Sequence, residues 1–191
     1  MSRFRAPLDQ RERGNALVEA AIITPLLITL LLGVVEFAML AKDNMTVGNG
    51  SRAGARVGSA AGQDPLADYN ILKAVEGATS GLATVDKVVV YHATSPSGAV
   101  PPGCLTGAGV AGVCNVYTGT DLAISQAAFQ AAGFTKDDSW SAGSRVTSQS
   151  APGGPDYLGI YVEGTHQSVT NLILTNRVVK DDVIMRLEPT L

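Results

Sequence analysis

The sequence is poor in the residue types that most often carry chemistry. Its 191 residues include two histidines, two cysteines and one tryptophan, and only 16% are charged. Aromatic residues make up 5% of the chain while glycine occurs 21 times, so we expect loops and small-residue packing rather than a large aromatic pocket. The formal charge is −3 and no run of like charges occurs, which gives no indication of a nucleic-acid partner.

Motifs for catalysis and for cofactor binding are also missing. The chain has no Gly-x-Ser-x-Gly elbow and no phosphate-binding loop, since no lysine directly follows a glycine. A Gly-x-Gly-x-x-Gly pattern at 107–112 lacks the preceding strand and following helix that dinucleotide binding requires. Glu163-x-x-His166 is half of a two-metal helix motif, and we interpret it as a solvated polar corner. We therefore expect no enzyme, no cofactor and no catalytic or metal site.

A long apolar stretch dominates the chain. Ala20–Ala41 contains Glu36 as its one charged residue, and four arginines lie in residues 1–13. The charge-free part, Ala20–Val35, spans about 24 Å as a helix, whereas crossing a bilayer takes roughly 20 residues. We therefore predict a transmembrane helix that continues to Ala41, with Glu36 near the outer headgroups, where its carboxylate reaches water. The arginines favour a cytoplasmic N-terminus with the rest of the chain outside.

Two residues of this helix need separate explanation. Pro25 removes a backbone hydrogen bond, which predicts a kink. Glu19 stands at the inner end of the run, where a charged residue costs roughly 2.5–3.5 kcal/mol on insertion scales and is usually functional. A cleaved secretory signal peptide is a poor alternative, because its apolar core has about 7–15 residues and no Ala-x-Ala site ends this run.

The residues before Glu19 resemble the processing site of type IV prepilins. Gly14-Asn15-Ala16-Leu17-Val18-Glu19 connects the arginine-rich head to the apolar helix. In that superfamily a membrane aspartic peptidase cuts after the glycine, and the glutamate pairs with the new α-amine of a neighbouring subunit. The resemblance implies cleavage between Gly14 and Asn15 and a role for Glu19 in subunit register. An ammonium–carboxylate pair in a dry filament core disfavours slipped arrangements, and the helix dipole favours a carboxylate near the N-terminus.

The longer stretch is similar to the TadE-like family, which comprises minor pilins or pseudopilins of the tight-adherence (Tad/Flp) pilus. The early Pro25 and the second carboxylate, Glu36, are typical of this branch, and the resemblance covers residues 13–60, with a looser likeness at 156–162 and 183–189. It implies a precursor that takes part in pilus assembly and surface adhesion. The implied partners are the prepilin peptidase, other pilin and pseudopilin subunits, the membrane assembly platform and the lipid bilayer. The implied location is the bacterial inner membrane, then the pilus or cell surface after assembly.

A second hypothesis belongs to another class of protein. The chain would be an uncleaved, single-span, membrane-anchored extracytoplasmic binding module that uses its sheet or loops to hold a ligand. An exported hydrolase is a third hypothesis. Replacing Glu19 discriminates between the first two, because only the pilin needs this carboxylate for assembly.

The chain divides by composition into three parts. We assign residues 1–14 to a cytoplasmic leader, 15–62 to the hydrophobic helix with its extension, and 63–191 to an extracytoplasmic head. Glycines recur every fourth residue from 50 to 62, which places them on one helix face and favours close packing of another backbone. A flexible glycine-rich hinge is the alternative, because glycine weakens a helix.

The head has the patterns of an α+β fold, a small antiparallel sheet with short helices. A helix is predicted from Pro65, with Asp64 as N-cap, and a shorter one over 121–132, with Asp121 as N-cap. β-branched or alternating segments predict strands at 87–93, at 157–163 and from 183 to the end at Pro189, and a helical turn is expected near 169–173.

The two cysteines lie in a glycine- and proline-rich segment, 95–119, that we interpret as a long loop. If this part of the chain is exported, Cys104 and Cys114 form a disulfide that ties the loop. Two free thiols in a reducing compartment are the alternative.

Overall fold

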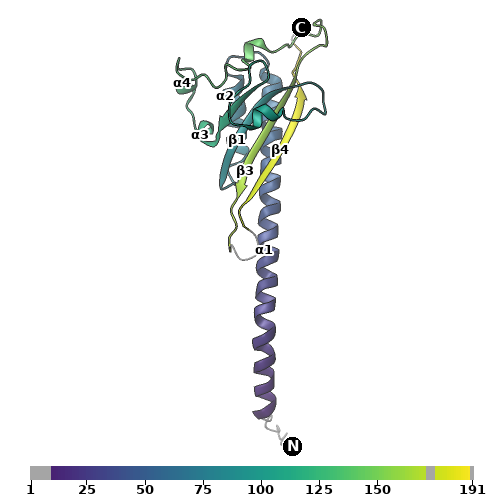
Figure 1. Ribbon diagram of the computed structural model, residues 1–191, viewed down its shortest axis with the longest axis vertical. Helices are drawn as coiled ribbons and strands as arrows, with labels where there is room; N and C mark the ends of the chain where they lie inside the picture. Colours follow the sequence, from purple (N-terminus) through teal and green to yellow (C-terminus); the bar gives the residue numbers. More distant parts are fainter. Residues whose placement is uncertain (1–9, 171–174, 190–191) are drawn as a thin grey trace, which may run out of the picture.

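One long helix, α1 (Gln10–Ala61), forms the axis of the molecule (Figure 1). The computed structural model describes residues 10–170 and 175–189. The helix has 52 residues and includes Pro25, so it is about 78 Å long at 1.5 Å per residue. Its inner half, residues 14–35, projects away from the rest of the chain, and its outer half, residues 36–61, lies along the head.

The head contains a four-stranded antiparallel sheet with the order β2-β1-β3-β4. These strands are β1 (Thr84–Ala93), β2 (Cys114–Thr118), β3 (Tyr157–His166) and β4 (Arg177–Arg186). The helical elements of the head are α2 (Ala67–Ala78), α3 (Gly119–Leu122), α4 (Gln126–Phe129) and the short 3₁₀ turns η1 (Pro102–Leu105) and η2 (Ala142–Ser144). The predicted α+β class, a long N-terminal helix followed by a small antiparallel sheet with short helices, is confirmed.

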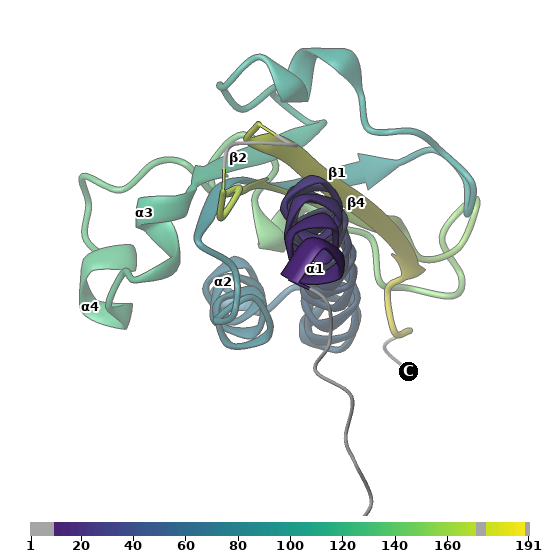
Figure 2. The same cartoon turned by 90° about the horizontal axis from the view of Figure 1, so that it is seen from below.

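Helices α1 and α2 cover one face of the sheet (Figure 2). The core between them joins side chains from α1, α2 and the two central strands, including Val47, Ala55, Ile71, Val75, Val88, Val90, Leu158 and Ile160. Alternate residues of each strand point to this face, as the period of two requires. The outer half of α1 therefore contributes to the core of the head, although composition suggests a boundary between the helix and the head at residue 62.

The glycines of the outer half allow α1 to approach the head closely. A Cβ added at Gly54 would lie 2.9 Å from Val75 Cγ2, and one added at Gly58 would lie 2.4 Å from Leu158 Cδ2. These contacts confirm the helical interpretation of the glycine repeat over a flexible hinge. Gly62, with φ 53°, follows the last helical residue in the left-handed conformation that commonly ends a helix.

The opposite face of the sheet is covered by the segment between β1 and β2, which contains the cysteines. Cys104 and Cys114 form a disulfide with Cα atoms 6.2 Å apart, and both are fully buried against Val89 and Tyr91. The predicted loop over 95–119 is partly wrong, because its last residues pair with β1 as β2. Because the segment is rich in glycine and proline, its sequence did not indicate this strand of five residues.

Two helix boundaries differ from the sequence-based prediction. Helix α2 begins at Ala67, and the Asp64 carboxylate instead accepts a hydrogen bond of 2.7 Å from the Leu66 N–H in the turn before it. The predicted helix over 121–132 is wrong, since two single turns, α3 and α4, occupy this region. Asp121 caps α3 from its third position through a reciprocal hydrogen bond with Thr118. The expected turn near 169–173 lies largely outside the described residues.

A buried polar cluster joins α2 to the segment after α4. The Asp68 carboxylate, 2% exposed, pairs with the Arg145 guanidinium and accepts hydrogen bonds of 2.7 Å from Asn115 and from the Tyr117 hydroxyl. The Arg145 side chain also lies over the Trp140 ring, 4.6 Å from its centroid. Burial, followed by the charge of Asp68, raises the pKa of Tyr117 well above its usual value. The cluster holds the loop before β3 onto the head.

Candidate functional site

The start of the candidate site, Gly14 to Glu19, lies within α1 and is exposed. Nothing lies within 4 Å of a Cβ built on the Gly14 backbone, so no side chain of the described residues packs against this position. Among the described residues, Glu19 makes neither an ion pair nor a hydrogen bond. Its carboxylate is therefore free to meet a charged group from outside the described part of the chain.

The inner half of α1 exposes its large apolar side chains on all sides. Exposed residues include Leu17, Val18, Ile22, Leu26, Leu27, Leu30, Leu31, Val34 and Val35. Among the described residues, α1 is the one helix long and apolar enough to cross a membrane, by length and composition. A helix that is apolar all round is stable when lipid or other helices surround it.

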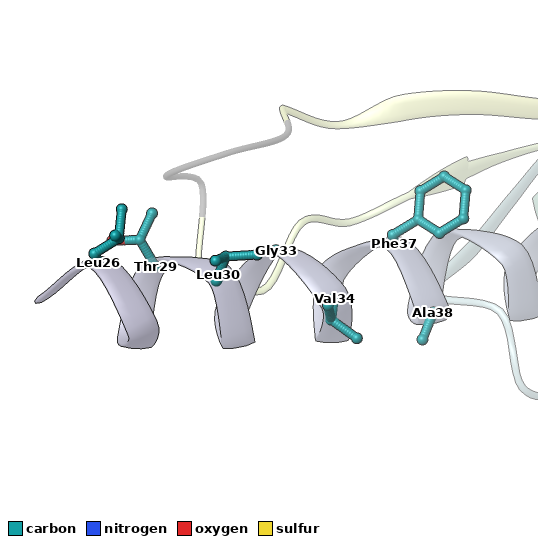
Figure 3. A pocket seen from close by; sticks show the side chains of 7 residues that line it. All are labelled: Leu26, Thr29, Leu30, Gly33, Val34, Phe37 and Ala38. Atoms are coloured by element: carbon teal, nitrogen blue, oxygen red, sulfur yellow. The ribbon is translucent and has the colours of Figure 1, made fainter. Parts of the chain in front are cut away.

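A groove of about 610 Å³ runs along this exposed surface from Leu26 to Ala38 (Figure 3). Gly33 leaves space between the larger side chains of Leu30 and Phe37. A surface of this shape allows close approach by another helix or by lipid chains.

Pro25 lies inside α1, and the helix continues on both sides of it. The Thr29 hydroxyl donates a hydrogen bond of 2.8 Å to the Pro25 carbonyl one turn earlier. This is the usual bond of a helical threonine to the carbonyl four residues earlier, whereas the carbonyl that loses its backbone donor at Pro25 is that of Ala21.

Glu36 marks the point where α1 meets the head. Its side chain is 0% exposed, and its carboxylate oxygens accept hydrogen bonds from the Val169 backbone N–H at 3.1 and 3.3 Å. We expected this carboxylate to reach water, but the segment after β3 covers it instead. These hydrogen bonds compensate the free-energy cost of burying the Glu36 carboxylate at the end of an apolar run.

A second buried polar contact lies two turns further along α1. His166, the last residue of β3, places Nδ1 2.7 Å from the Asp43 carboxylate, and its side chain is 1% exposed. The interpretation of His166 as part of a solvated corner is therefore wrong. Both residues line a hollow of about 340 Å³ beside Lys42.

Sequence reasoning missed the contacts of Asp43 and Val169. One signal was present, because Glu36 and Asp43 are seven residues apart and so share the helix face that the glycines continue. The partner segment after β3 carried no comparable pattern.

Possible metal ligands do not gather in the described part of the chain. Within residues 10–170 and 175–189, no group of three or more histidine, cysteine, aspartate or glutamate side chains is arranged to hold a metal ion. The disulfide, Glu19 and Glu36 lie in different parts of the molecule, so the site consists of a surface and not of converging catalytic groups.

Comparison with known protein families identifies the segment that carries these features. Residues 14–56 match the family model of TadE-like proteins. The match begins at Gly14 and includes Glu19, Pro25, Glu36 and the first glycines of the outer half. No curated protein and no solved structure matches the chain.

The TadE-like match agrees with the resemblance seen in the residues. The match covers 43 of the 191 residues, all of them within α1, and is a similarity to a family whose description points to the Tad pilus. Together with the apolar helix, it indicates a single-pass membrane protein that interacts with the membrane and with other pilus components.

Proposed function

We propose that this TadE-like chain is the precursor of a minor pilin or pseudopilin of a tight-adherence pilus. A prepilin peptidase cleaves it between Gly14 and Asn15. The chain lies in the bacterial inner membrane with its N-terminus inside and its head outside. Helix α1 then associates with other pilin and pseudopilin subunits at the assembly platform, and the head contributes to adhesion at the cell surface.

The inner half of α1 is the observation that carries this proposal. Its large apolar side chains are exposed, and Glu19 has no charged partner among the described residues. A new α-amine at Asn15 of a neighbouring subunit would supply that partner. In an apolar environment such a pair contributes mainly by disfavouring other registers, since an unpaired carboxylate there is costly.

The N-terminus of the protein recovered from membranes is the first measurement. Mass spectrometry of the N-terminal peptide is expected to show a chain that begins at Asn15 in cells with an active prepilin peptidase, and an intact leader in cells without it. An intact leader in both strains would contradict the proposal and favour an uncleaved anchored binding module.

Replacing Glu19 tests the assembly step separately. Glu19→Gln is expected to insert and be processed normally but to be lost from sheared pili or from pilin complexes isolated by crosslinking. Glu188→Gln is the matched control, because Glu188 is an exposed glutamate of the head. Equal assembly of both variants would show that the Glu19 carboxylate does not set the register.

A further inference from the structure

The hollow beside Lys42 lies between α1 and the lower end of the head. It has a volume of about 340 Å³, and its walls come from α1 at Met39, Lys42 and Asp43, from the turn at residues 80–83 and from the end of β3. The turn connects α2 to β1, which begins at the end of the head nearer to the exposed half of α1 (Figure 1). Three separate segments of the chain therefore enclose one space.

Some polar groups of this hollow have no partner in the described part of the chain. The Lys42 amine makes neither an ion pair nor a hydrogen bond there, and it lies 3.8 Å from a Cβ built on Gly81. Among the same residues, the N–H groups of Ser80 and Gly81 donate to no backbone carbonyl. A free cation beside free N–H groups of a turn favours the binding of an anion.

His166, in the wall of the hollow, is an independent indication of a ligand. Its side chain is 1% exposed, and its Nδ1 lies 2.7 Å from the Asp43 carboxylate. The other ring nitrogen, Nε2, is buried and has no hydrogen-bond partner among the described residues. Buried polar atoms are nearly always paired, so an unpaired one beside a hollow indicates a bound ligand or a water held with it.

The position of Lys42 along α1 matches the headgroup layer of a membrane. A hydrocarbon core of about 30 Å takes roughly 20 helical residues, which counted from Ala20 end near Met39. Lys42 lies about 4.5 Å further out, and the headgroups extend roughly 5–7 Å beyond the hydrocarbon on each side. Lysine side chains at this depth commonly reach lipid phosphates. A phosphodiester is therefore the anion that this surrounding supplies.

We propose that the hollow binds a phosphate group, with the headgroup of an outer-leaflet phospholipid as the source that the level of Lys42 favours. Lys42 and the turn at residues 80–83 hold the phosphate oxygens. His166 in its imidazolium form donates from Nδ1 to Asp43 and from Nε2 to the phosphate, directly or through a water. The charges then balance, because a phosphodiester and the Asp43 carboxylate face two cations. A headgroup held in this way fixes the height of the head above the bilayer.

Native mass spectrometry of the full chain tests this site. The protein is released from nonionic detergent micelles after incubation with phosphatidylglycerol, with diacylglycerol, or with inorganic phosphate alone. The parent protein is expected to retain phosphatidylglycerol but not diacylglycerol. Lys42→Gln should lower this retention about tenfold, the usual effect of losing a charge-assisted hydrogen bond. Lys180→Gln is the matched control, because Lys180 is an exposed lysine of β4 that does not line the hollow.

A second pair of variants separates the shape of the hollow from the charge of Lys42. Gly81→Leu fills the hollow and keeps the lysine, since a Cβ built on Gly81 has only the Lys42 Nζ, at 3.8 Å, within 4 Å. Gly77→Leu adds the same side chain one turn earlier, on α2, where nothing lies within 4 Å. We expect Gly81→Leu to lose phosphatidylglycerol as Lys42→Gln does, and Gly77→Leu to retain it.

The outcomes distinguish the possible ligands. Retention of inorganic phosphate that Lys42→Gln and Gly81→Leu both abolish would support the site with free phosphate as its ligand. Equal retention of phosphatidylglycerol by the parent, Lys42→Gln and Gly81→Leu would overturn the proposal, as would retention of diacylglycerol to the same extent, since lipid would then bind the apolar surface of α1. Normal retention by Gly81→Leu alone would also overturn it, because the charge of Lys42 would suffice without the hollow.

The result is independent of processing. The measurement uses the uncleaved chain without other pilus subunits, so failure of the cleavage experiment leaves the phosphate site intact. Failure of the binding experiment likewise leaves the pilin proposal intact.

Discussion

The two halves of helix α1 differ in what their side chains contact. In the inner half, Leu26, Leu30 and the other large apolar residues are exposed. In the outer half, Val47 and Ala55 are fully buried, and the glycines lie against α2 and β3. The change occurs at Glu36, where the head first covers the helix.

This difference reflects where the packing partner of each half comes from. The outer half packs on a partner in its own chain, so its contact residues are small and matched to particular side chains such as Leu158 at Gly58. The inner half has large leucine, isoleucine and valine side chains that suit lipid and other helices alike. The stability of the head should therefore depend on the outer half and on the head's own contacts, and assembly should depend on the inner half.

The largest expected effect on stability comes from the buried pair in the head. Arg145→Met leaves the Asp68 carboxylate buried without its cation, which should lower the free energy of unfolding by about 3–5 kcal/mol. Urea unfolding in detergent, followed by Trp140 fluorescence, measures the change.

Lys73→Met is the control for this variant. Lys73 pairs with Glu76 at 2.9 Å in a partly exposed position, so its loss should cost less than about 1 kcal/mol. Similar effects of the two substitutions would mean that the head does not depend on its buried pair.

The disulfide is expected to have the next largest effect. Replacing Cys104 and Cys114 together by serine removes a crosslink with a sequence separation of 10, which should cost about 2–3 kcal/mol. The segment it ties covers Val89 and Tyr91, so the far face of the sheet should become accessible to hydrophobic dyes. The unreduced parent protein should unfold at a higher urea concentration than the double serine variant, and reduction of the parent should abolish that difference. Equal urea midpoints for the unreduced parent and the variant would contradict a structural role for the disulfide.

Gly58→Ala tests the outer half directly, Gly77→Ala on α2 is its control, and the two substitutions should change stability in opposite directions. Gly58→Ala places a methyl group against Leu158 and Ile71, and this overpacking should cost about 1–3 kcal/mol, partly offset by better helix propensity. Gly77→Ala, on the exposed side of α2 with nothing within 4 Å, should stabilise the head by about 0.5–1 kcal/mol. Thermal unfolding measures both, and a stabilising Gly58→Ala would show that α1 does not pack closely on the head.

The helix, the glycine face and most of the sheet could be predicted from the sequence, because each has a strong local pattern. Each pattern indicates both the type of element and the face that it buries. The patterns are the apolar run from Ala20, the four-residue glycine spacing, and the alternation of Leu158, Ile160 and Val162. Gly14 and Glu19 could be recognised because the Gly-x-x-x-x-Glu pattern that they form directly precedes the apolar run.

Other features depend on contacts between distant segments and left no local pattern. Strand β2 is short and follows a glycine-rich segment, so only its pairing with β1 reveals it. The burial of Glu36 and His166 arises where β3 returns to α1, which no spacing within either segment shows. The two turns α3 and α4 begin at the capping residues Thr118 and Ser125, but each ends after four residues, a length that is not stable as a helix without tertiary contacts.

The smallest expected effect on head stability tests the inner half. Leu30 is 60% exposed in the groove of Figure 3, so Leu30→Ala should change the free energy of unfolding of the head by less than about 0.5 kcal/mol. Leu158→Ala is the matched control, because Leu158 is fully buried and its truncation should cost about 2–5 kcal/mol. If Leu30→Ala instead weakens recovery of the protein in pilin complexes while the head unfolds as before, the partner of the inner half lies outside this chain. A loss of head stability comparable with that of Leu158→Ala would remove the distinction between the two halves of α1.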